Sequence, residues 1–457
     1  MSQILPTAGP TVGEPGTCAD TPANAATGTA AGPAAATTAD PVSQRASYPE
    51  ISVAADGSIT IPRELAQQWG LVPGATTRID VRENHLEIRR PVSHLNQIYV
   101  ELTTGCNIDC RTCMRNVWSE HTGFMSEETF ARIVHEVATM QVAPTVFFGG
   151  FGEPLHHPQA VEYIRRMAET GAVVDLITNG TLLTEARIDQ LVDAGLRRVW
   201  VSLDGARPES YSDVRLGASL PRVLKNLETL NRRKRRLART QPELGIAFVA
   251  MDKNIGDLPE VVGIGLDYGA QHFSISNVLA HDEHLRPQTL YDREAAAWNP
   301  RRASVDIARM DSEDPRVTAA IQGMLQAGSR TRGGVELGFA PEGDRCPFID
   351  KGSTSIRWDG QVSACLALLH THTYYVGDSR RTSYEHTFGS VGDTSLVEIW
   401  NSPDYVDFRR RLEEFSFSPC TTCRACERIE ENLSDCTGHE HPACGGCLWA
   451  QGFVRCP

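Results

Sequence analysis

Apolar and polar positions alternate with two different periods between residues 97 and 280. Six short apolar runs have the length of β-strands, and the segments between them have helical periodicity. The predicted strands are Gln97–Leu102, Thr145–Phe148, Ala172–Thr178, Arg198–Ser202, Gly245–Val249 and His272–Asn277. The predicted helices are Ser126–Met140, Pro158–Thr170, Glu185–Ala194 and Leu220–Arg236, and Ser126 is a favourable N-cap. This alternation predicts an α/β fold, a partial (β/α)6 barrel with its chemistry at the carboxyl ends of the strands.

The chain before residue 97 divides into a tail and a small unit. Residues 1–45 are mostly Ala, Thr, Pro and Gly, a composition that cannot bury enough apolar surface to fold, so we predict a disordered tail. In residues 51–90, two alternating runs flank a short helix, with turns at Asp56-Gly57 and Pro73-Gly74. This unit resembles the swapped-hairpin fold of AbrB-type regulators. Its five Arg balance five acidic residues, so it lacks the basic face that DNA binding needs, and a docking or dimerisation role is favoured.

The chain after residue 280 changes character twice. Residues 281–340 are polar and irregular, which predicts a linker or insert with one helix over Pro315–Ala327. Residues 341–457 contain nine cysteines in 117 positions. So dense a group predicts a separate metal-binding domain.

Composition favours a cytoplasmic enzyme. The chain is 41% hydrophobic and 22% charged, and it has neither an apolar run that could span a membrane nor a signal peptide pattern. In a reducing compartment, most of its thirteen cysteines are expected to bind metal, and Cys18 in the tail is not. The net charge of −13 disfavours nucleic acid and anionic membranes and weakly favours cationic substrates, although many cytosolic proteins are equally acidic.

Three cysteines follow the first predicted strand of the barrel. Cys106, Cys110 and Cys113 form a C-x₃-C-x₂-C run. Three thiolates on one loop hold three irons of a cubane cluster and leave the fourth iron open. Zinc is the alternative, but a closed zinc site prefers four ligands and no fourth ligand is near in sequence.

The cysteine run and three later motifs resemble the radical SAM superfamily, whose members bind S-adenosylmethionine (SAM) to a [4Fe–4S] cluster and cleave it to a 5′-deoxyadenosyl radical. The motifs are Phe148–Pro154, Ile177–Gly180 and Val201–Gly205, each at a strand end. The resemblance implies SAM contacts from Gly150, Gly152, Glu153, Asn179, Gly180, Ser202 and Arg215. Thr112 stands where the family more often has an aromatic residue.

The cysteine-rich end resembles the SPASM extension of radical SAM enzymes, which carries auxiliary [4Fe–4S] clusters. The implied ligands are Cys346, Cys365, Cys420, Cys423, Cys426, Cys436, Cys444, Cys447 and Cys456. Their later spacing departs from the usual pattern, so one or two clusters are expected and the spare cysteine is not identified. Structural zinc is the alternative. The segments CPFIDKG, RWDGQVSAC and CGGCLWAQGFVRCP resemble a branch of maturases for tungsten-cofactor oxidoreductases.

Several ionisable residues are candidates for substrate chemistry. A radical dehydration needs a general base and a general acid, and the catalytic candidates are Asp204, His281, Asp282 and Glu283. His281–His284 is equally typical of a solvated loop, and a structural role is favoured for His370 and His372. The chain also resembles SPASM-like radical SAM diol dehydratases of aminoglycoside biosynthesis. With the acidic charge, the predicted disordered tail and the lack of a peptide-leader recognition domain, this favours dehydration of a cationic aminosugar diol in antibiotic biosynthesis, with flavodoxin or ferredoxin as reductant. The alternative is maturation of a tungsten-cofactor oxidoreductase or its peptide.

Overall fold

The structure is a computed structural model that describes residues 53–81, 86–291, 305–307, 310–311, 314–328, 338–339, 345–418, 420–421 and 426–457. It divides into two units, Met1–Thr60 and Ile61–Pro457. The predicted tail with Cys18, much of the predicted linker and Cys423 lie outside the described residues. The boundaries predicted for the separate domains therefore stay predictions.

An 11-stranded sheet forms the centre of the second unit, in the order β12-β11-β10-β9-β7-β6-β5-β3-β13-β14-β17. Its parallel part contains all six predicted strands, which confirms the α/β fold expected from the sequence. These strands and the two that extend them are β3 (Gln97–Val100), β5 (Thr145–Phe148), β6 (Val173–Thr178), β7 (Arg198–Ser202), β9 (Glu243–Ala250), β10 (Ala270–Asn277), β11 (Val305–Ile307) and β12 (Gly338–Phe339).

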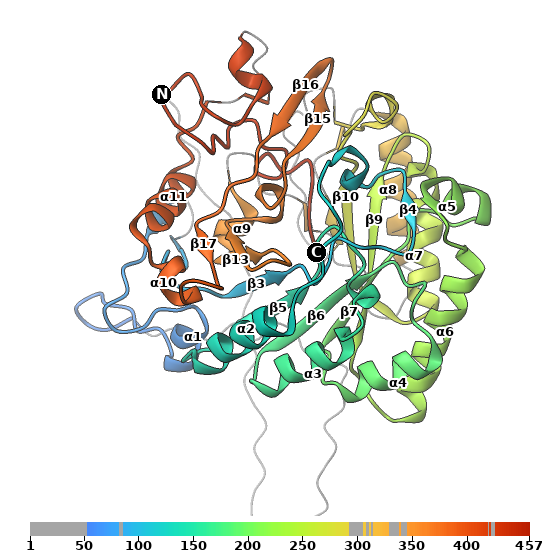
Figure 1. Ribbon diagram of the computed structural model, residues 1–457, viewed down its shortest axis with the longest axis horizontal. Helices are drawn as coiled ribbons and strands as arrows, with labels where there is room; N and C mark the ends of the chain where they lie inside the picture. The colour runs from blue at the N-terminus through green and yellow to red at the C-terminus, as the bar shows by residue number, and fades with distance from the viewer. Residues whose placement is uncertain are drawn as a thin grey trace, which may run out of the picture. The chain divides into compact units, whose positions relative to one another are not determined.

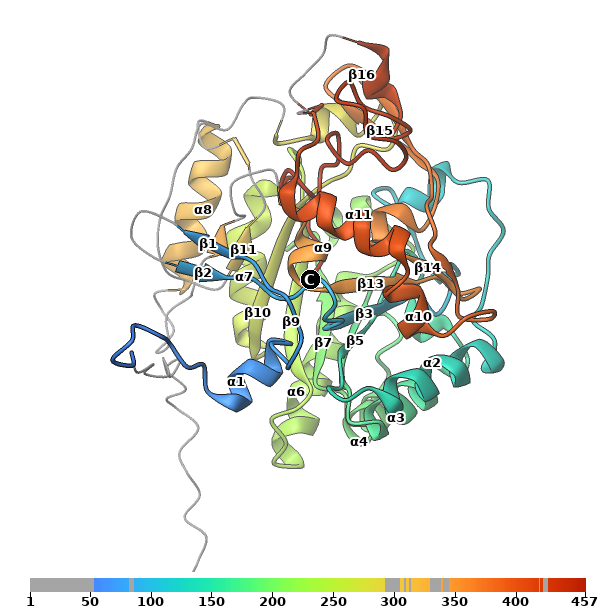
Figure 2. The same cartoon turned by 90° about the vertical axis from the view of Figure 1, so that its left-hand side faces the viewer.

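Amphipathic helices cover the outside of this sheet (Figures 1 and 2). They are α2 (Glu127–Thr139), α3 (Ala160–Glu169), α4 (Glu185–Asp193), α5 (Pro208–Val214), α6 (Leu220–Arg236), α7 (Leu258–Asp267) and α8 (Pro315–Gly328). Ser126 caps α2 as predicted, because its side chain accepts a hydrogen bond from the Thr129 amide at 3.0 Å. None of the described helices is long and apolar enough to cross a membrane.

The cysteine-rich part continues the same sheet. β13 (Ser353–Ile356) pairs in parallel with β3, and β14 (Gln361–Ser363) and β17 (Gly389–Ser390) follow antiparallel. The hairpin of β15 (His372–Val376) and β16 (Ser379–Ser383) and the helices α9 (Pro347–Asp350), α10 (Leu396–Trp400) and α11 (Pro403–Glu414) complete this part. The sequence did not predict that backbone hydrogen bonds would join it directly to the barrel.

The end of the chain returns to the carboxyl end of β10. The Asn277 side chain donates to the Phe453 carbonyl at 2.7 Å, and the Arg455 amide donates to the Ser276 hydroxyl at 2.9 Å. The C-terminal segment therefore lies at the edge of the sheet where the predicted chemistry is located.

The small amino-terminal elements are short. In the first unit, Val53 and Ile59 form an isolated bridge around the turn at Asp56-Gly57. The second unit begins with α1 (Arg63–Gln68) and the hairpin of β1 (Ile79–Val81) and β2 (Leu86–Ile88). An AbrB-like fold for residues 51–90 stays a prediction.

Candidate functional site

The three cysteines after β3 face one cavity at the carboxyl ends of the parallel strands. Most of the residues expected to contact SAM also line it. The lining includes Cys106, Cys110, Cys113, Gly150, Gly152, Glu153, Asn179, Ser202 and Arg215. Gly180, which adopts a positive φ of 75°, follows Asn179 in the chain and is not part of the lining. The structure therefore brings together residues that are up to 109 positions apart in the sequence, from Cys106 to Arg215.

Each thiol of the cysteine run has its own polar donor. Nε of Arg115 lies 3.1 Å from Sγ of Cys113, and Nδ2 of Asn179 lies 3.8 Å from Sγ of Cys106. Nη1 of Arg215 lies 3.9 Å from Sγ of Cys110, because β4 (Asp109–Cys110) pairs with β8 (Arg215–Leu216). Two guanidinium groups and one amide therefore surround the three sulfurs, which is an environment suited to thiolates.

Cys106 and Cys110 are nevertheless poor acids without a metal. Burial raises the pKa of Cys106, and it raises the pKa of Cys110 to about 11. Coordination to a metal deprotonates a thiol outright. The buried sulfurs, their donors and the open cavity fit a cluster held by three cysteines.

The glycine–glutamate loop, which is the motif Phe148–Pro154, is shaped by close backbone contact. A Cβ on Gly152 would lie 2.0 Å from the carbonyl oxygen of Thr103, so only glycine fits there. The buried Glu153 accepts hydrogen bonds from the Thr178 hydroxyl and the Asn179 amide, both at 2.7 Å. Burial raises the pKa of Glu153. This carboxylate thus fixes the end of β6 in addition to lining the cavity.

Asp204 and Arg215 form a buried ion pair with an N–O distance of 2.6 Å. The other oxygen of Asp204 accepts a hydrogen bond from the Val249 amide at 2.8 Å. Burial alone would lower the pKa of the Arg215 guanidinium, but the charge of Asp204 raises it. Asp204 is completely buried and does not line the cavity, so the structure gives it a partner inside the protein rather than a substrate.

The other candidates for acid–base chemistry also lie outside the lining of this cavity. His281 is buried, and neither of its ring nitrogens has a hydrogen-bond partner among the described residues. Burial lowers its pKa. Asp282 accepts a hydrogen bond from the Leu285 amide at 2.9 Å, and Glu283 is exposed. Their catalytic roles stay predictions, and this structure does not bring them to the three cysteines.

The C-terminal segment supplies cavity residues that the sequence analysis missed. Trp449, Val454 and Arg455 line the cavity together with Asn277 and Leu279. No local motif marks these residues, because they reach the site only through the docking of the chain end on β10. The basic neighbour Arg115 was also missed, although its position two residues after Cys113 was a usable signal.

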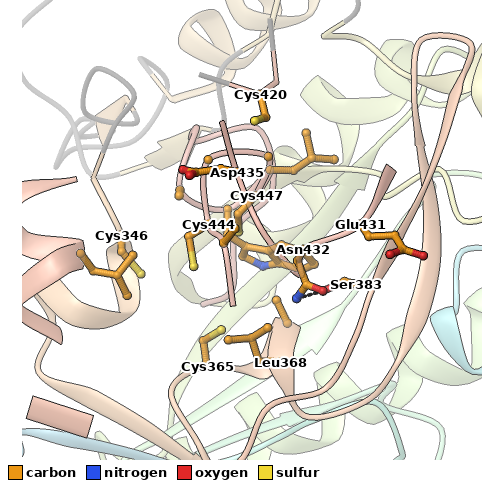
Figure 3. A pocket seen from close by; sticks show the side chains of 18 of the residues that line it. Cys346, Cys365, Leu368, Ser383, Cys420, Glu431, Asn432, Asp435, Cys444 and Cys447 are labelled. Carbon is orange, nitrogen blue, oxygen red and sulfur yellow. Dashed lines mark hydrogen bonds between the residues drawn. The ribbon is translucent and has the colours of Figure 1, made fainter. Parts of the chain in front are cut away.

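A second cavity gathers cysteines from the C-terminal part (Figure 3). Cys346, Cys365, Cys420, Cys444 and Cys447 line it among apolar side chains such as Leu368 and Leu448. Burial raises the pKa of Cys365, and the nearby Cys346 and Cys447 raise it further. Burial raises the pKa of Cys444 in the same way, followed by Cys447, Cys346 and Cys365. Cys346, Cys365, Cys444 and Cys447 act on one another electrostatically, and four thiols are a complete ligand set for one cubane cluster.

The remaining C-terminal cysteines are placed differently. Cys426 and Cys436 are exposed, and Sγ of Cys436 lies 2.9 Å from the Ser418 hydroxyl. Cys456 is partly buried beside Trp449. None of the described cysteines is in a disulfide. Among all the residues that the structure describes, no three His, Cys, Asp or Glu side chains are grouped so that they could hold a single metal ion.

Comparison with known proteins matches two regions of the chain. Residues 100–240 match the radical SAM superfamily, and residues 346–427 match the SPASM iron–sulfur cluster-binding domain. The "tungsten-containing aldehyde ferredoxin oxidoreductase cofactor-modifying protein" of Pyrococcus furiosus is 28% identical over 79% of this chain and 97% of its own length. A PqqA peptide cyclase of Ruegeria pomeroyi is 27% identical over 74% of this chain and 80% of its own.

The solved structures that match this chain are more distant in sequence. Streptococcus suis SuiB bound to precursor peptide SuiA is 13% identical, with a TM-score of 0.49 over 72% of this chain and 70% of that one. The structure of native anSMEcpe with bound AdoMet is 16% identical, with a TM-score of 0.49 over 78% of this chain and 96% of that one.

Proposed function

The chain is an enzyme with a radical SAM domain and a SPASM domain, and on this premise we propose that it matures a tungsten-containing oxidoreductase by modifying that protein's cofactor. The observation that carries the proposal is the match to the cofactor-modifying protein of Pyrococcus furiosus, which extends over 97% of that protein. The match also extends over 79% of this chain, which is far more than the radical SAM domain at residues 100–240.

The two domains imply the cofactors of the enzyme. They are a [4Fe–4S] cluster that binds SAM and auxiliary iron–sulfur clusters. When bound, the first cluster supplies the electron that cleaves SAM to a 5′-deoxyadenosyl radical. We assign Cys106, Cys110 and Cys113 to this cluster, and Cys346, Cys365, Cys444 and Cys447 to an auxiliary cluster.

The chain's own residues have three tasks in this mechanism. Arg115, Asn179 and Arg215 place hydrogen-bond donors around the three thiolates and offset their negative charge. Gly152 and Glu153 hold the glycine–glutamate loop, which is expected to contact SAM, against the end of β6. The C-terminal side chains, such as Trp449, complete the wall of the cavity and reduce the access of water to a reactive radical.

The relatives do not support the aminosugar diol dehydration that the sequence favoured. Their names describe the modification of an oxidoreductase cofactor and the cyclisation of a peptide. The predicted acid–base candidates also lie outside the cavity lining. The proposed substrate is therefore carried by, or destined for, another protein, rather than a free aminosugar.

Co-expression tests the proposal. A tungsten-containing aldehyde oxidoreductase from the organism that encodes this chain is produced with the wild-type chain, with the Cys106→Ala variant, or alone. We expect a changed mass of the extracted oxidoreductase cofactor only with the wild-type chain, because the variant lacks one thiolate of the SAM-cleaving site. An identical cofactor mass in all three preparations, from a wild-type chain loaded with iron, would contradict the proposal.

A further inference from the structure

Arg381 is a buried cation without an anionic partner in the described part of the chain. It lies in β16 and is 1% exposed. Its Nη2 donates to the carbonyl oxygen of Cys420 at 2.9 Å, and the Tyr374 hydroxyl lies beside the guanidinium, whereas Nε and Nη1 have no hydrogen bond of normal geometry among the described residues. No described carboxylate lies within ion-pair distance of its guanidinium. Buried charges are ordinarily paired, because an isolated ion loses its hydration at a large cost in free energy.

The guanidinium of Arg381 contacts two cysteine-bearing loops. One contact is the hydrogen bond to Cys420. The other is with Gly446, on which a Cβ would lie 3.1 Å from Nη1 of Arg381. Gly446 lies between Cys444 and Cys447, and its carbonyl accepts a hydrogen bond from the Tyr374 hydroxyl at 3.1 Å. The glycine in this C-G-G-C segment thus lets the guanidinium approach the loop.

Arg381 does not itself line the cysteine cavity, but the residues that contact it do. Cys420, Gly446 and Tyr374, which lie against Arg381, all line this cavity. Figure 3 shows Cys420 at the same cavity as Cys444 and Cys447. Four thiolates carry more negative charge than an oxidised cubane core carries positive charge, so an assembled cluster is a net anion. The orphaned guanidinium nitrogens therefore fit a neighbouring iron–sulfur site.

An arginine that does line this cavity is less suited to the same role. Arg428 lines the cavity, but it is exposed and its Nη1 donates to the Asp435 carbonyl at 2.9 Å. Solvent and salt screen an exposed charge. The buried guanidinium of Arg381 acts in a medium of lower dielectric constant, so its effect on a nearby charge is larger.

We propose that Arg381 is the counter-ion of the auxiliary iron–sulfur site and raises its reduction potential. Reduction adds one electron to a site that is already negative, and a nearby cation stabilises the reduced form more than the oxidised form. Net charge and hydrogen bonds around the sulfurs are known determinants of cluster potential. The proposal concerns the auxiliary site alone and does not depend on the identity of the substrate.

An EPR-monitored redox titration of the full-length protein tests this role. The Cys106→Ala/Cys110→Ala/Cys113→Ala background leaves only the auxiliary signals, and wild-type protein is titrated in parallel. Arg381→Gln removes the charge, and Arg381→Lys keeps it. Arg380→Gln is the matched control, because Arg380 is the exposed neighbour on the same strand.

The expected result is a lower midpoint potential for Arg381→Gln. At a fixed potential, the ratio of reduced to oxidised cluster should fall roughly tenfold, which corresponds to about 59 mV for a one-electron couple. The decrease in midpoint potential for Arg381→Lys should be at most half of the decrease for Arg381→Gln. Arg380→Gln should match the parent protein. An unchanged potential in an Arg381→Gln protein with full iron content would overturn the proposal.

Loss of the cluster is also an informative outcome. If Arg381→Gln loses auxiliary iron while Arg381→Lys keeps it, a positive charge is required at this position and the proposal is supported. If both variants lose the iron to the same extent, the shape of the arginine rather than its charge holds the site, and the proposal is wrong.

Discussion

Nε2 of His370 lies 2.8 Å from Oε2 of Glu101, and both side chains are buried. Nδ1 of His370 lies 2.7 Å from Oε2 of Glu120, and the ring of Trp118 stacks on the imidazole with centroids 4.2 Å apart. The other oxygen of Glu101 accepts a hydrogen bond from the Phe151 amide at 3.1 Å. An imidazole from the cysteine-rich part is thus joined through one carboxylate to the glycine–glutamate loop.

This arrangement predicts a pH-dependent contribution to stability. Burial alone would lower the pKa of His370, but the hydrogen bonds and charges of Glu101 and Glu120 outweigh burial and raise it. A raised folded-state pKa stabilises the fold fully below the unfolded value of about 6.5, and this stabilisation is lost as the pH rises through the folded-state pKa. As the pH rises above about 6.5, the melting temperature of the wild-type protein should therefore fall more steeply than that of His370→Gln.

Anaerobic thermal unfolding measures this difference. His284→Gln is a suitable control, because His284 is exposed in the loop that contains Asp282. It should keep the wild-type slope of melting temperature against pH. If His370→Gln also keeps that slope, the imidazole is neutral between its two carboxylates and the electrostatic link is absent.

The buried pair of Asp204 and Arg215 predicts a large structural effect. Asp204→Asn leaves a buried guanidinium without its counter-ion, which should reduce the free energy of unfolding by about 3–5 kcal/mol. Lys253→Met breaks the more exposed pair of Lys253 with Asp213 and should cost less than about 1 kcal/mol. Denaturant unfolding compares the two, and equal effects would contradict the assignment of Asp204 to a structural pair.

The first cysteine run predicts a separable loss of iron. Replacing Cys106, Cys110 and Cys113 together with Ala should remove about four irons, because one cubane holds four, and should leave the auxiliary iron in place. Formation of 5′-deoxyadenosine from SAM and dithionite should cease. Iron analysis and chromatography of the nucleoside products measure both quantities. Continued cleavage of SAM in this variant would show that the SAM-cleaving site lies elsewhere.

The shared cavity of Cys346, Cys365, Cys444 and Cys447 predicts a non-additive loss. Cys365→Ser should remove about four irons, and Cys365→Ser/Cys447→Ser should remove no more than the single variant, because both thiols hold the same cluster. Mössbauer spectra and iron content distinguish the two results. A loss of about eight irons in the double variant would place the two cysteines on different clusters.

The sequence predicted the barrel well because its signals are local. Each strand from Gln97 to Asn277 has its own apolar run, and Ser126 marks a helix start without help from distant residues. The motifs at successive strand ends also have a fixed geometric meaning in a parallel sheet, so their meeting at one cavity followed from the strand order.

The relationships that the sequence analysis missed depend on distant contacts. His370 meets Glu101 across 269 positions, and Arg455 reaches the cavity only because the chain end docks on β10. Arg380 and Arg381 are adjacent residues of the same type, so the local sequence does not show which one is buried. The pairing of β15 with β16 decides this. The preference for an aminosugar rested in part on net charge, which reports on the whole surface and not on the cavity.

Release of 5′-deoxyadenosine under single-turnover conditions tests the central claim most directly. Anaerobically reconstituted protein, SAM and dithionite are mixed with a tungsten-containing aldehyde oxidoreductase that carries its cofactor, with a short peptide, or with an aminosugar diol. The account predicts that the oxidoreductase or its cofactor stimulates release and that the Cys106→Ala variant gives none. Stimulation by the aminosugar alone, in protein with its full iron content, would contradict it.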